Sequence, residues 1–417
     1  MKHNPITITR AVRRYLLVWV PLMAAMLSSC SNDDGTSASS GNLPQDGRLR
    51  FTAALDSSWE ETTRGERVES ELEHAFGLFA YTYANGNSWT PANQKPDMLC
   101  DQEVTMVPEG WATTSLVTLP PAGTNIQFFA YYPYRDPEMA EDEYQFLTSR
   151  PQWNPEAKDG AGDGTPGNPL FGFQTATNAI EQEDFLVGVS KAYQVPAKVE
   201  DFFATPVKLR FRHMLAGVLF KVGDEFAEPM TINSISITNV RLAANLRVAP
   251  PTNSDYATAT YTWQDLSSRG TVTVEPQFEV KRPAADDANT DVGKVINSGD
   301  QMMFLIPQML SDPDDYASEG NVQSVISVRV NDNVTLEAKL NKTELKRGKI
   351  TVFTISVNSL SKLSLTTQII NWNSDPENTF GGSAQEGNAI IPTTAIDNWV
   401  DYDDEGSFTK TMEQPKD

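Results

Sequence analysis

The run PVKLRFRHMLAGVLFKV, residues 206–222, limits most strictly what this chain can fold into. From Val207 to Arg212, apolar side chains occupy every second position and basic side chains, the last of them Arg212, occupy the positions between. This alternation is typical of a β-strand in a sheet with one face on a core and the other in water. The Ala-Gly pair at 216–217 interrupts the alternation and predicts a bulge or a turn there.

Further strand-like runs, rich in aromatic and β-branched residues, recur along the chain, whereas long amphipathic helical patterns are scarce. The runs lie at residues 48–55, 75–83, 125–134, 183–190, 231–240, 257–263, 270–280, 301–308, 322–332, 334–340, 349–357 and 361–372. Their connections are rich in Asn, Asp, Gly, Ser and Pro. Many short strands at close spacing predict an all-β fold built from β-sandwiches.

The length and the strand positions favour two sandwiches in tandem, at residues 48–205 and 206–372. The segment QVPAKVEDFFATP, residues 194–206, is the expected seam between them. The longest connection, residues 136–182, contains DGAGDGTPGNPLFG and is predicted to be a mobile surface excursion. Residues 373–417 are predicted to form a polar tail.

The first 29 residues predict a secretory signal peptide. Residues 1–14 are basic, and the apolar run YLLVWVPLMAAM, residues 15–26, is shorter than the roughly 20 residues that span a bilayer. The following LSSC, residues 27–30, resembles the lipobox of bacterial lipoproteins. Cys30 would then become the first residue and carry diacylglycerol through a thioether. The alternative is a cysteine that happens to end an ordinary signal peptide.

Residues 30–47 are predicted to be a lipidated cysteine followed by a flexible tether, because SNDDGTSASSGNLPQDG is polar and cannot bury a core. Its early acidic pair resembles the surface-export signal of Bacteroidetes lipoproteins. The alternative is a solvated linker that carries no export signal. Removal of residues 1–29 takes away four basic residues and shifts the formal net charge from −22 to −26. Such a surface repels nucleic acid and anionic headgroups, so no nucleic-acid partner is expected.

Residues suited to catalysis are few. Cys100 has no disulfide partner once Cys30 is lipidated, and we expect a buried or semi-buried small side chain rather than a nucleophile. His74 and His213 lie far apart in the sequence and outside any zinc-binding spacing, so His213 is interpreted as a structural side chain within a strand. The sequence also lacks a nucleophile-elbow or phosphate-loop motif. We therefore expect no enzyme activity, no metal site and no cofactor.

Three acidic stretches and three tryptophans are candidate binding residues. The acidic stretches at 159–164, 311–316 and 401–406 lack the ligand spacing of a calcium loop and are interpreted as solvated loops. Exposed tryptophans can stack on sugars, but core packing is their commoner use. The candidates are Trp89, Trp111 and Trp153.

Several segments, in order, resemble the fimbrillin family, the type V pilus subunits and related surface lipoproteins of Bacteroidales. The matching segments are LSSCSNDDG (27–35), LRFTAAL (49–55) with TTRGE (62–66), FGLFAYTY (76–83), IQFFAYYPY (126–134), DFLVGVS (184–190), VKLRFRHMLAGVLFKV (207–222), MMFLIPQ (302–308) and ELKRGKITVFTISV (344–357). Each motif alone is weak, but their order along the chain identifies the family.

The resemblance implies two tandem transthyretin-like β-sandwiches and assembly by strand exchange. A protease would cut the lipidated precursor after an arginine, the first strand would leave, and a strand from another subunit would fill the groove. Here residues 48–59 match the removable strand, and cleavage between Arg64 and Gly65 is the preferred site. Arg50 and Arg67 are rivals, and Arg64 as an ordinary loop residue is the alternative.

The apolar segment AIIPTTAIDNWV, residues 389–400, is the candidate donor strand, although Pro392 weakens ladder pairing. A tip or accessory subunit that donates no strand therefore stays open. The sequence predicts a structural pilus subunit for adhesion, at the cell surface and, before processing, on the outer membrane through Cys30. Its expected partners are other pilin subunits. The alternative is a non-polymerising surface lipoprotein, either a pilus anchor or a module that binds glycans or proteins.

Overall fold

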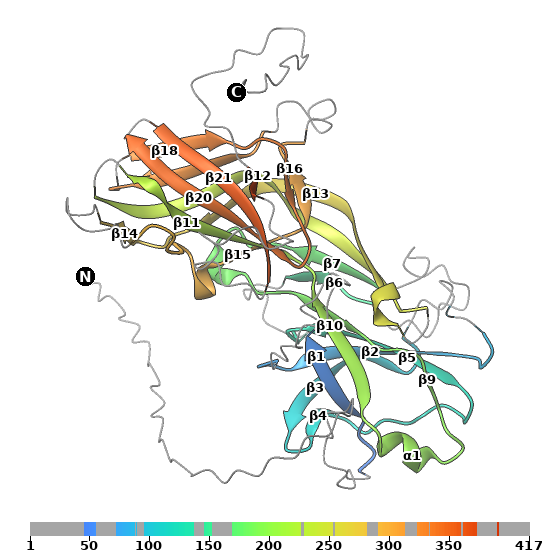
Figure 1. Cartoon of the computed structure of the whole chain (residues 1–417). Helices are drawn as coiled ribbons and strands as arrows, with labels where there is room; N and C mark the ends of the chain where they lie inside the picture. Colours follow the sequence, from blue (N-terminus) through green and yellow to red (C-terminus); the bar gives the residue numbers. More distant parts are fainter. Residues whose placement is uncertain are drawn as a thin grey trace, which may run out of the picture. The chain divides into compact units, whose positions relative to one another are not determined.

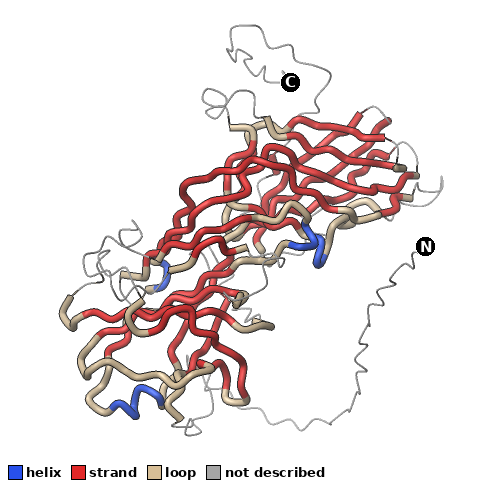
Figure 2. Tube along the Cα trace, turned by 180° about the vertical axis from the view of Figure 1, so that it is seen from behind, coloured by secondary structure: helices blue, strands red, loops and turns tan. Residues whose placement is uncertain are grey.

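A computed structural model describes residues 46–55, 72–87, 89, 96–136, 146–151, 169–226, 229–252, 255–281, 291–312, 323–332, 334–359, 362–372 and 390–391. These residues are almost entirely β-structure (Figures 1 and 2), which confirms the predicted all-β class. The exceptions are one short helix, α1 (Val199–Phe203), and 3₁₀ turns at Ala179–Glu181, Tyr256–Thr258 and Gly299–Gln301. No helix of the described segments is long and apolar enough to cross a membrane.

Most strands of the N-terminal half of the described chain form one sheet that closes on itself. Its strands are β1 (Arg50–Leu55), β2 (Phe76–Tyr83), β3 (Leu99–Val107), β4 (Gly110–Thr113), β5 (Asn125–Tyr132), β8 (Leu186–Val189), β9 (Tyr193–Gln194) and β10 (Val207–His213). They follow the order β2-β3-β4-β1-β10-β8-β5-β9, and β2 also pairs with β5. We call the ring from β2 round to β5 the closed sheet.

Aromatic side chains fill the closed sheet and also cover part of its outer surface. On β2, Phe76 and Leu78 belong to the cluster inside the ring, whereas Phe79 and Tyr81 belong to a second cluster outside it. All four side chains are fully buried. A strand that is apolar on both faces must be covered on both, which explains why FGLFAYTY does not alternate with polar residues.

The remaining strands form a seven-stranded and a five-stranded sheet around one shared apolar cluster, with a two-stranded ribbon beside them. One sheet contains β6 (Leu147–Ser149), β7 (Leu170–Gln174), β12 (Met230–Ala249), β13 (Thr260–Val274), β14 (Phe278–Val280), β17 (Val325–Val330) and β18 (Val334–Lys339). The other contains β11 (Ala216–Phe226), β15 (Met303–Leu305), β20 (Lys349–Ser359), β21 (Lys362–Asn371) and β22 (Ile390–Ile391). The ribbon pairs β16 (Gln308–Leu310) with β19 (Thr343–Leu345).

Two placements differ from those expected from the sequence. Strand β10, expected to open the second sandwich, lies in the closed sheet and pairs with β1 and β8. Strands β6 and β7 come from the segment expected to be a mobile excursion, yet β7 pairs with β12 of the second half. Local alternation identifies a strand but not its neighbours, because pairing partners lie far away in sequence.

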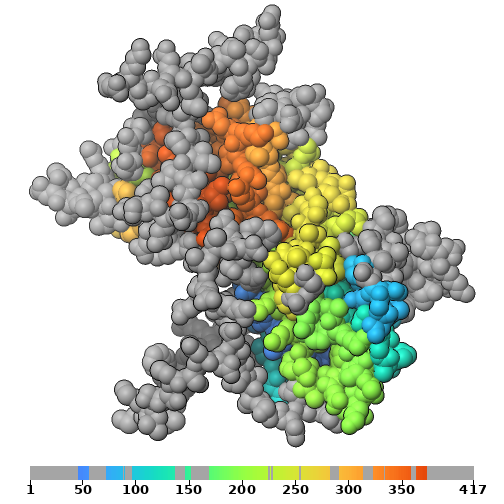
Figure 3. Space-filling view, turned by 45° about the vertical axis from the view of Figure 1, so that its right-hand side comes forward, coloured from blue at the N-terminus to red at the C-terminus, as the bar shows by residue number. Residues whose placement is uncertain are grey.

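Strand β12 contributes to two apolar clusters. Its buried apolar residues up to Leu242 lie in the cluster between the seven-stranded and five-stranded sheets. Ala244, Leu246 and Val248 lie in the cluster that contains Phe79 of β2. In the space-filling view the yellow surface that contains residues 255–265 adjoins the green surface of β10 (Figure 3), where the Tyr256 hydroxyl donates to the Lys208 carbonyl oxygen at 3.2 Å. The described strands accordingly belong to one compact unit, Leu43–Asp417.

Candidate functional site

Strand β1 occupies a slot between β4 and β10 in the closed sheet. It pairs in parallel with β10 from Phe51 opposite Val207 to Leu55 opposite Phe211. On its other side it pairs antiparallel with β4 only at Arg50 and Phe51. Because β1 is the first strand of the described chain, it can leave the sheet without any other strand being cut.

One face of β1 forms part of the interior of the closed sheet. Leu49 is fully buried and Phe51 is 2% exposed. The Phe51 ring lies edge-on to Phe76 and Phe128, with centroids 6.0 and 5.9 Å away. Burial of side chains of this size stabilises the folded state by about 1.5–3 kcal/mol each. The apolar face is therefore the main attachment of β1 to its slot.

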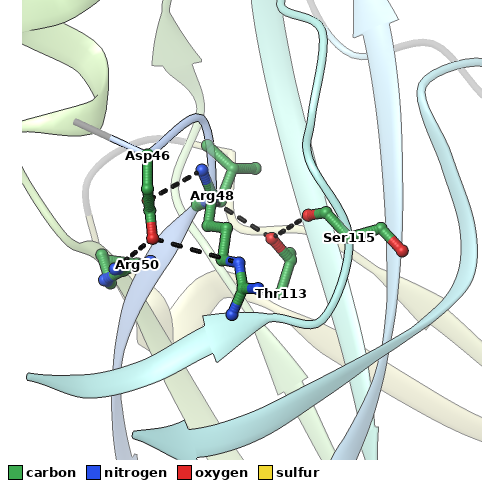
Figure 4. Close-up of polar contacts among 6 residues, drawn as sticks. Asp46, Arg48, Arg50, Thr113 and Ser115 are labelled. Atoms are coloured by element: carbon green, nitrogen blue, oxygen red, sulfur yellow. Dashed lines mark hydrogen bonds and ion pairs between the residues drawn. The ribbon is translucent and has the colours of Figure 1, made fainter. Parts of the chain in front are cut away.

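Backbone contacts fix the beginning of β1. The Val117 backbone N–H donates to the Gly47 carbonyl oxygen at 2.8 Å, and the Thr113 N–H donates to the Leu49 carbonyl oxygen at 3.1 Å. The Thr113 hydroxyl accepts from the Leu49 N–H at 3.2 Å and donates to the Ser115 carbonyl oxygen at 2.8 Å (Figure 4). Thr113 thus joins β1 to the chain beyond β4.

We expect Thr113→Val to lower the free energy of unfolding by about 1–3 kcal/mol, because the buried Leu49 N–H loses its acceptor while the side-chain volume is kept. Urea denaturation measures the change. Thr52→Val is the matched control, since this side chain on β1 is exposed. Equal stability of the Thr113 and Thr52 variants would contradict the role given to the Thr113 hydroxyl.

The opposite face of β1 carries a buried guanidinium. Arg50 is only 4% exposed, and its Nη2 atom lies 3.0 Å from Oδ2 of Asp46 (Figure 4). The Arg48 backbone N–H also donates to Oδ1 of Asp46, at 3.2 Å. Burial raises the pKa of Asp46, but the hydrogen bonds from Arg50 and Arg48 outweigh it, so the pKa lies below its ordinary value. Among the described residues, Nε and Nη1 of Arg50 have no hydrogen-bond partner.

The depressed pKa of Asp46 predicts a loss of stability in acid. A carboxylate whose folded pKa is lowered stabilises the fold above its unfolded value of 3.8 and loses that contribution as the pH falls through the folded pKa. We therefore expect Asp46→Asn to be less stable than wild type near neutral pH and equal to it in strong acid. Urea midpoints at a series of pH values measure this difference; a gap that persists well below pH 3.8 would contradict it.

Most of the sequence-predicted processing residues lie outside the described residues. These are Cys30, Arg64, Gly65 and Arg67. The rival cleavage residue Arg50 is described, and it is buried within a paired strand, where a protease cannot reach it. Of the candidate donor segment 389–400, β22 alone is described; Ile390 lies opposite Gln368 and Ile391 opposite Thr367 of β21.

The other candidate residues take part in packing. His213 is 7% exposed; its Nδ1 atom lies 2.5 Å from Oδ2 of Asp184, and its ring stacks on Trp372 at 4.0 Å. Trp111 is 6% exposed within the cluster that holds Phe51. Cys100 is half-buried, with Sγ 3.6 Å from the Pro151 carbonyl oxygen.

Two further aromatic candidates also make ring contacts. Trp89 packs against Phe129 at 5.6 Å, and His74 stacks on Tyr132 at 6.4 Å. Trp153 lies outside the described residues. Within the described segments no group of three or more His, Cys, Asp or Glu side chains is placed to hold a metal ion.

Sequence reasoning missed Asp46 and Thr113. The spacing of Asp46 and Arg50 was visible, but four-residue spacing ahead of a strand carries no recognised signal. Thr113 is one of many threonines in the chain, and only the fold shows that its hydroxyl faces the Leu49 N–H. The site therefore consists of the slot and the strand that fills it, rather than a set of reactive side chains.

The chain was compared with known proteins. It is similar to a fimbrial protein from Bacteroides vulgatus, with 14% sequence identity, a TM-score of 0.46 and coverage of 78% of this chain and 99% of that one. It is also similar to the tip fimbrial protein Mfa3 from Porphyromonas gingivalis, with 9% identity, a TM-score of 0.31 and coverage of 78% and 98%. No curated protein sequence matches significantly. The profile of the fimbrillin-like family matches residues 63–372, most of the chain, and the protein therefore belongs to the fimbrillin-like family.

Proposed function

We propose that this protein is a structural subunit of a cell-surface pilus that assembles by proteolysis-triggered strand exchange and supports adhesion. The observation that carries the proposal is the place of β1, a single N-terminal strand that completes a closed sheet and fills its interior with Leu49 and Phe51. In this proposal the protein performs no chemistry. Its fold consists of two tandem transthyretin-like sandwiches, and Cys30 carries the lipid of the precursor on the outer membrane.

Loss of β1 would create a site that only an extended segment can fill. Strands β4 and β10 would each present an unpaired edge, and the interior lined by Phe76, Trp111 and Phe128 would open to water. Unpaired strand edges pair readily with other chains, and large exposed apolar patches mark interaction sites. A strand from another pilin subunit would supply main-chain hydrogen bonds and alternate apolar side chains together.

The segment that would be cut connects β1 to β2 and is polar. EETTRGERVESELE, residues 60–73, contains Arg64, which an arginine-specific protease would read through its guanidinium. The candidate donor, residues 389–400, contains Pro392, which removes one ladder donor. Its β22 residues pair with β21 of the same chain in the structure.

The deciding experiment is the intact mass of the protein sheared from the surface of cells that make it. A chain that begins at Gly65 without lipid is the expected result, and Arg64→Ala should abolish it while Arg67→Ala does not. On gels the cut form should run as a ladder of oligomers, and boiling the sample should remove the ladder. Recovery only from membranes, with lipid on Cys30 and residues 31–64 intact, would contradict proteolytic maturation.

One observation favours the second candidate function, a non-polymerising surface lipoprotein that binds glycans. The outer face of β12, β17 and β18 carries an open hollow of about 230 Å³. Its lining consists of hydroxyl groups, one guanidinium and one carboxylate, from Ser234, Ser236, Ser327, Thr335, Arg329 and Glu275. Binding of the monomer on a glycan array, lost in Arg329→Ala, would support this alternative; a blank array would reject it.

A further inference from the structure

We propose that Arg50 makes β1 a weak occupant of its own slot, so that the slot selects a strand from another subunit with an uncharged side chain at this position. The same incoming strand would carry a large apolar side chain at the Phe51 position. This inference rests on the proposed strand exchange and names the kind of segment that replaces β1.

The environment of Arg50 is unfavourable for a charged side chain. Its neighbours Leu49 and Phe51 face the interior of the closed sheet, so Arg50 lies on the opposite face, where a strand residue is ordinarily solvated. It is nevertheless only 4% exposed. Two of its three side-chain nitrogens, Nε and Nη1, are buried without a hydrogen-bond partner among the described residues. Buried polar atoms that stay unpaired lower stability, so this residue opposes the attachment that Phe51 provides.

The negative charge that pairs with Arg50 comes from its own segment and not from the strands that line the slot. The partner of Arg50 is Asp46, four residues earlier in the same segment, with a side chain that is 38% exposed. Within the described residues, every ion pair of this segment joins Asp46 to Arg48 or Arg50, and none reaches β4 or β10. Both charges therefore leave together when β1 leaves, and the vacated slot keeps no unpaired buried charge of this pair.

A strand that is uncharged at the Arg50 position would fill the slot more stably than β1 does. Replacement of a buried ion pair by apolar side chains of similar volume is commonly neutral or stabilising, whereas removal of one partner is strongly destabilising. An incoming strand that is uncharged at the Arg50 position keeps the backbone pairing with β10 and avoids burying a guanidinium. At the Phe51 position it must still fill the space beside Phe76 and Phe128. The slot thus distinguishes a donor strand from β1 at the Arg50 position, and it requires of both a large apolar side chain at the Phe51 position.

The test measures how fast β1 leaves a folded chain. The uncleaved chain without residues 1–29 is made with a site-specific protease sequence in place of residues 60–66 and a fluorophore at its N-terminus, and is cut after folding. Release of the labelled fragment is followed by fluorescence anisotropy with excess unlabelled peptide of residues 46–59 as competitor. Arg50→Met keeps the aliphatic stem and removes the buried charge, whereas the Asp46 side chain that it leaves unpaired is 38% exposed and solvated. We therefore expect release about 10-fold slower than in wild type.

Two further variants test the effect of charge in this segment and the effect of the ion pair between Asp46 and Arg50. Arg48→Met makes the same change of charge in the same segment at a side chain that is 41% exposed, and its release rate should match that of wild type. Asp46→Asn leaves the buried guanidinium without its partner and should release at least about 10-fold faster. In the emptied slot, a 46–59 peptide with Arg50→Met should bind more tightly than the wild-type peptide.

The outcomes separate this inference from the proposed function. If Arg50→Met releases at the wild-type rate or faster, the inference is overturned while strand exchange stands. If the wild-type fragment stays bound until the whole chain unfolds, strand exchange itself fails. In that case the urea midpoint of the uncut chain still tests Arg50: the inference requires a higher midpoint for Arg50→Met than for Arg48→Met.

Discussion

Replacement of Phe51 by alanine is expected to lower the free energy of unfolding by about 3–5 kcal/mol, the usual range for truncation of a buried aromatic side chain. Phe51 is 2% exposed and contacts the rings of Phe76 and Phe128 inside the closed sheet. After Phe51, β1 offers only Ala53, which is small, and Leu55, which is only partly buried, so Leu49 and Phe51 are the large side chains of this segment that are fully inside. The cavity would therefore lie directly beneath the strand that the proposed mechanism removes.

Urea denaturation followed by tryptophan fluorescence measures the effect, since Trp111 lies in the same cluster. Thr52→Ala is the control, because Thr52 is adjacent in β1 and its side chain is exposed. Hydrogen exchange should also show that β1 opens more readily in Phe51→Ala than the rest of the closed sheet does. A loss below about 1 kcal/mol, close to an ordinary surface substitution, would contradict the anchoring role of Phe51.

Replacement of Tyr131 by alanine should cost a similar amount, about 3–5 kcal/mol. Tyr131 is fully buried on β5, and its ring covers Gly77 of β2, where a Cβ atom would lie only 2.0 Å from the ring atom Cε1. Its hydroxyl donates to Oδ1 of Asp101 at 2.7 Å. Burial raises the pKa of Asp101, so loss of the hydroxyl leaves a carboxyl that is already poorly solvated.

Two companion variants divide this effect. Tyr131→Phe keeps the ring and should lose only about 1–3 kcal/mol, because Arg150 still lies 3.6 Å from Asp101. Gly77→Ala should destabilise the wild type by steric conflict with the ring but add little once Tyr131 is alanine, a non-additivity that a double-mutant cycle measures. Purely additive effects of Gly77→Ala and Tyr131→Ala would show that the ring does not pack on Gly77.

The positions of several strands follow from neighbouring residues, whereas the burial of a strand face depends on residues far away in the sequence. Apolar alternation located β1 and β10, and aromatic and β-branched content located β2. These local patterns predicted the all-β class, because each is set by consecutive residues. The same alternation placed Arg212 of β10 on a wet face, yet Arg212 is 8% exposed and packs over the Tyr261 ring at 5.8 Å. The covering residue lies about fifty positions later, so the strand itself contains no sign of it.

By itself the sequence therefore determined the all-β class, many of the strands and the family resemblance, and it predicted Cys30 as the lipidated residue and Arg64 as the cleavage residue. Only the tertiary structure decided that β10 joins β1 in the closed sheet, that β7 crosses to pair with β12, and that Arg50 is buried beside Asp46. Strand formation follows from the period of neighbouring side chains, whereas sheet neighbours and burial of a given face follow from packing between segments that are distant along the chain. The slot of β1 belongs to the second kind, because residues from 46 to 211 must meet to form it.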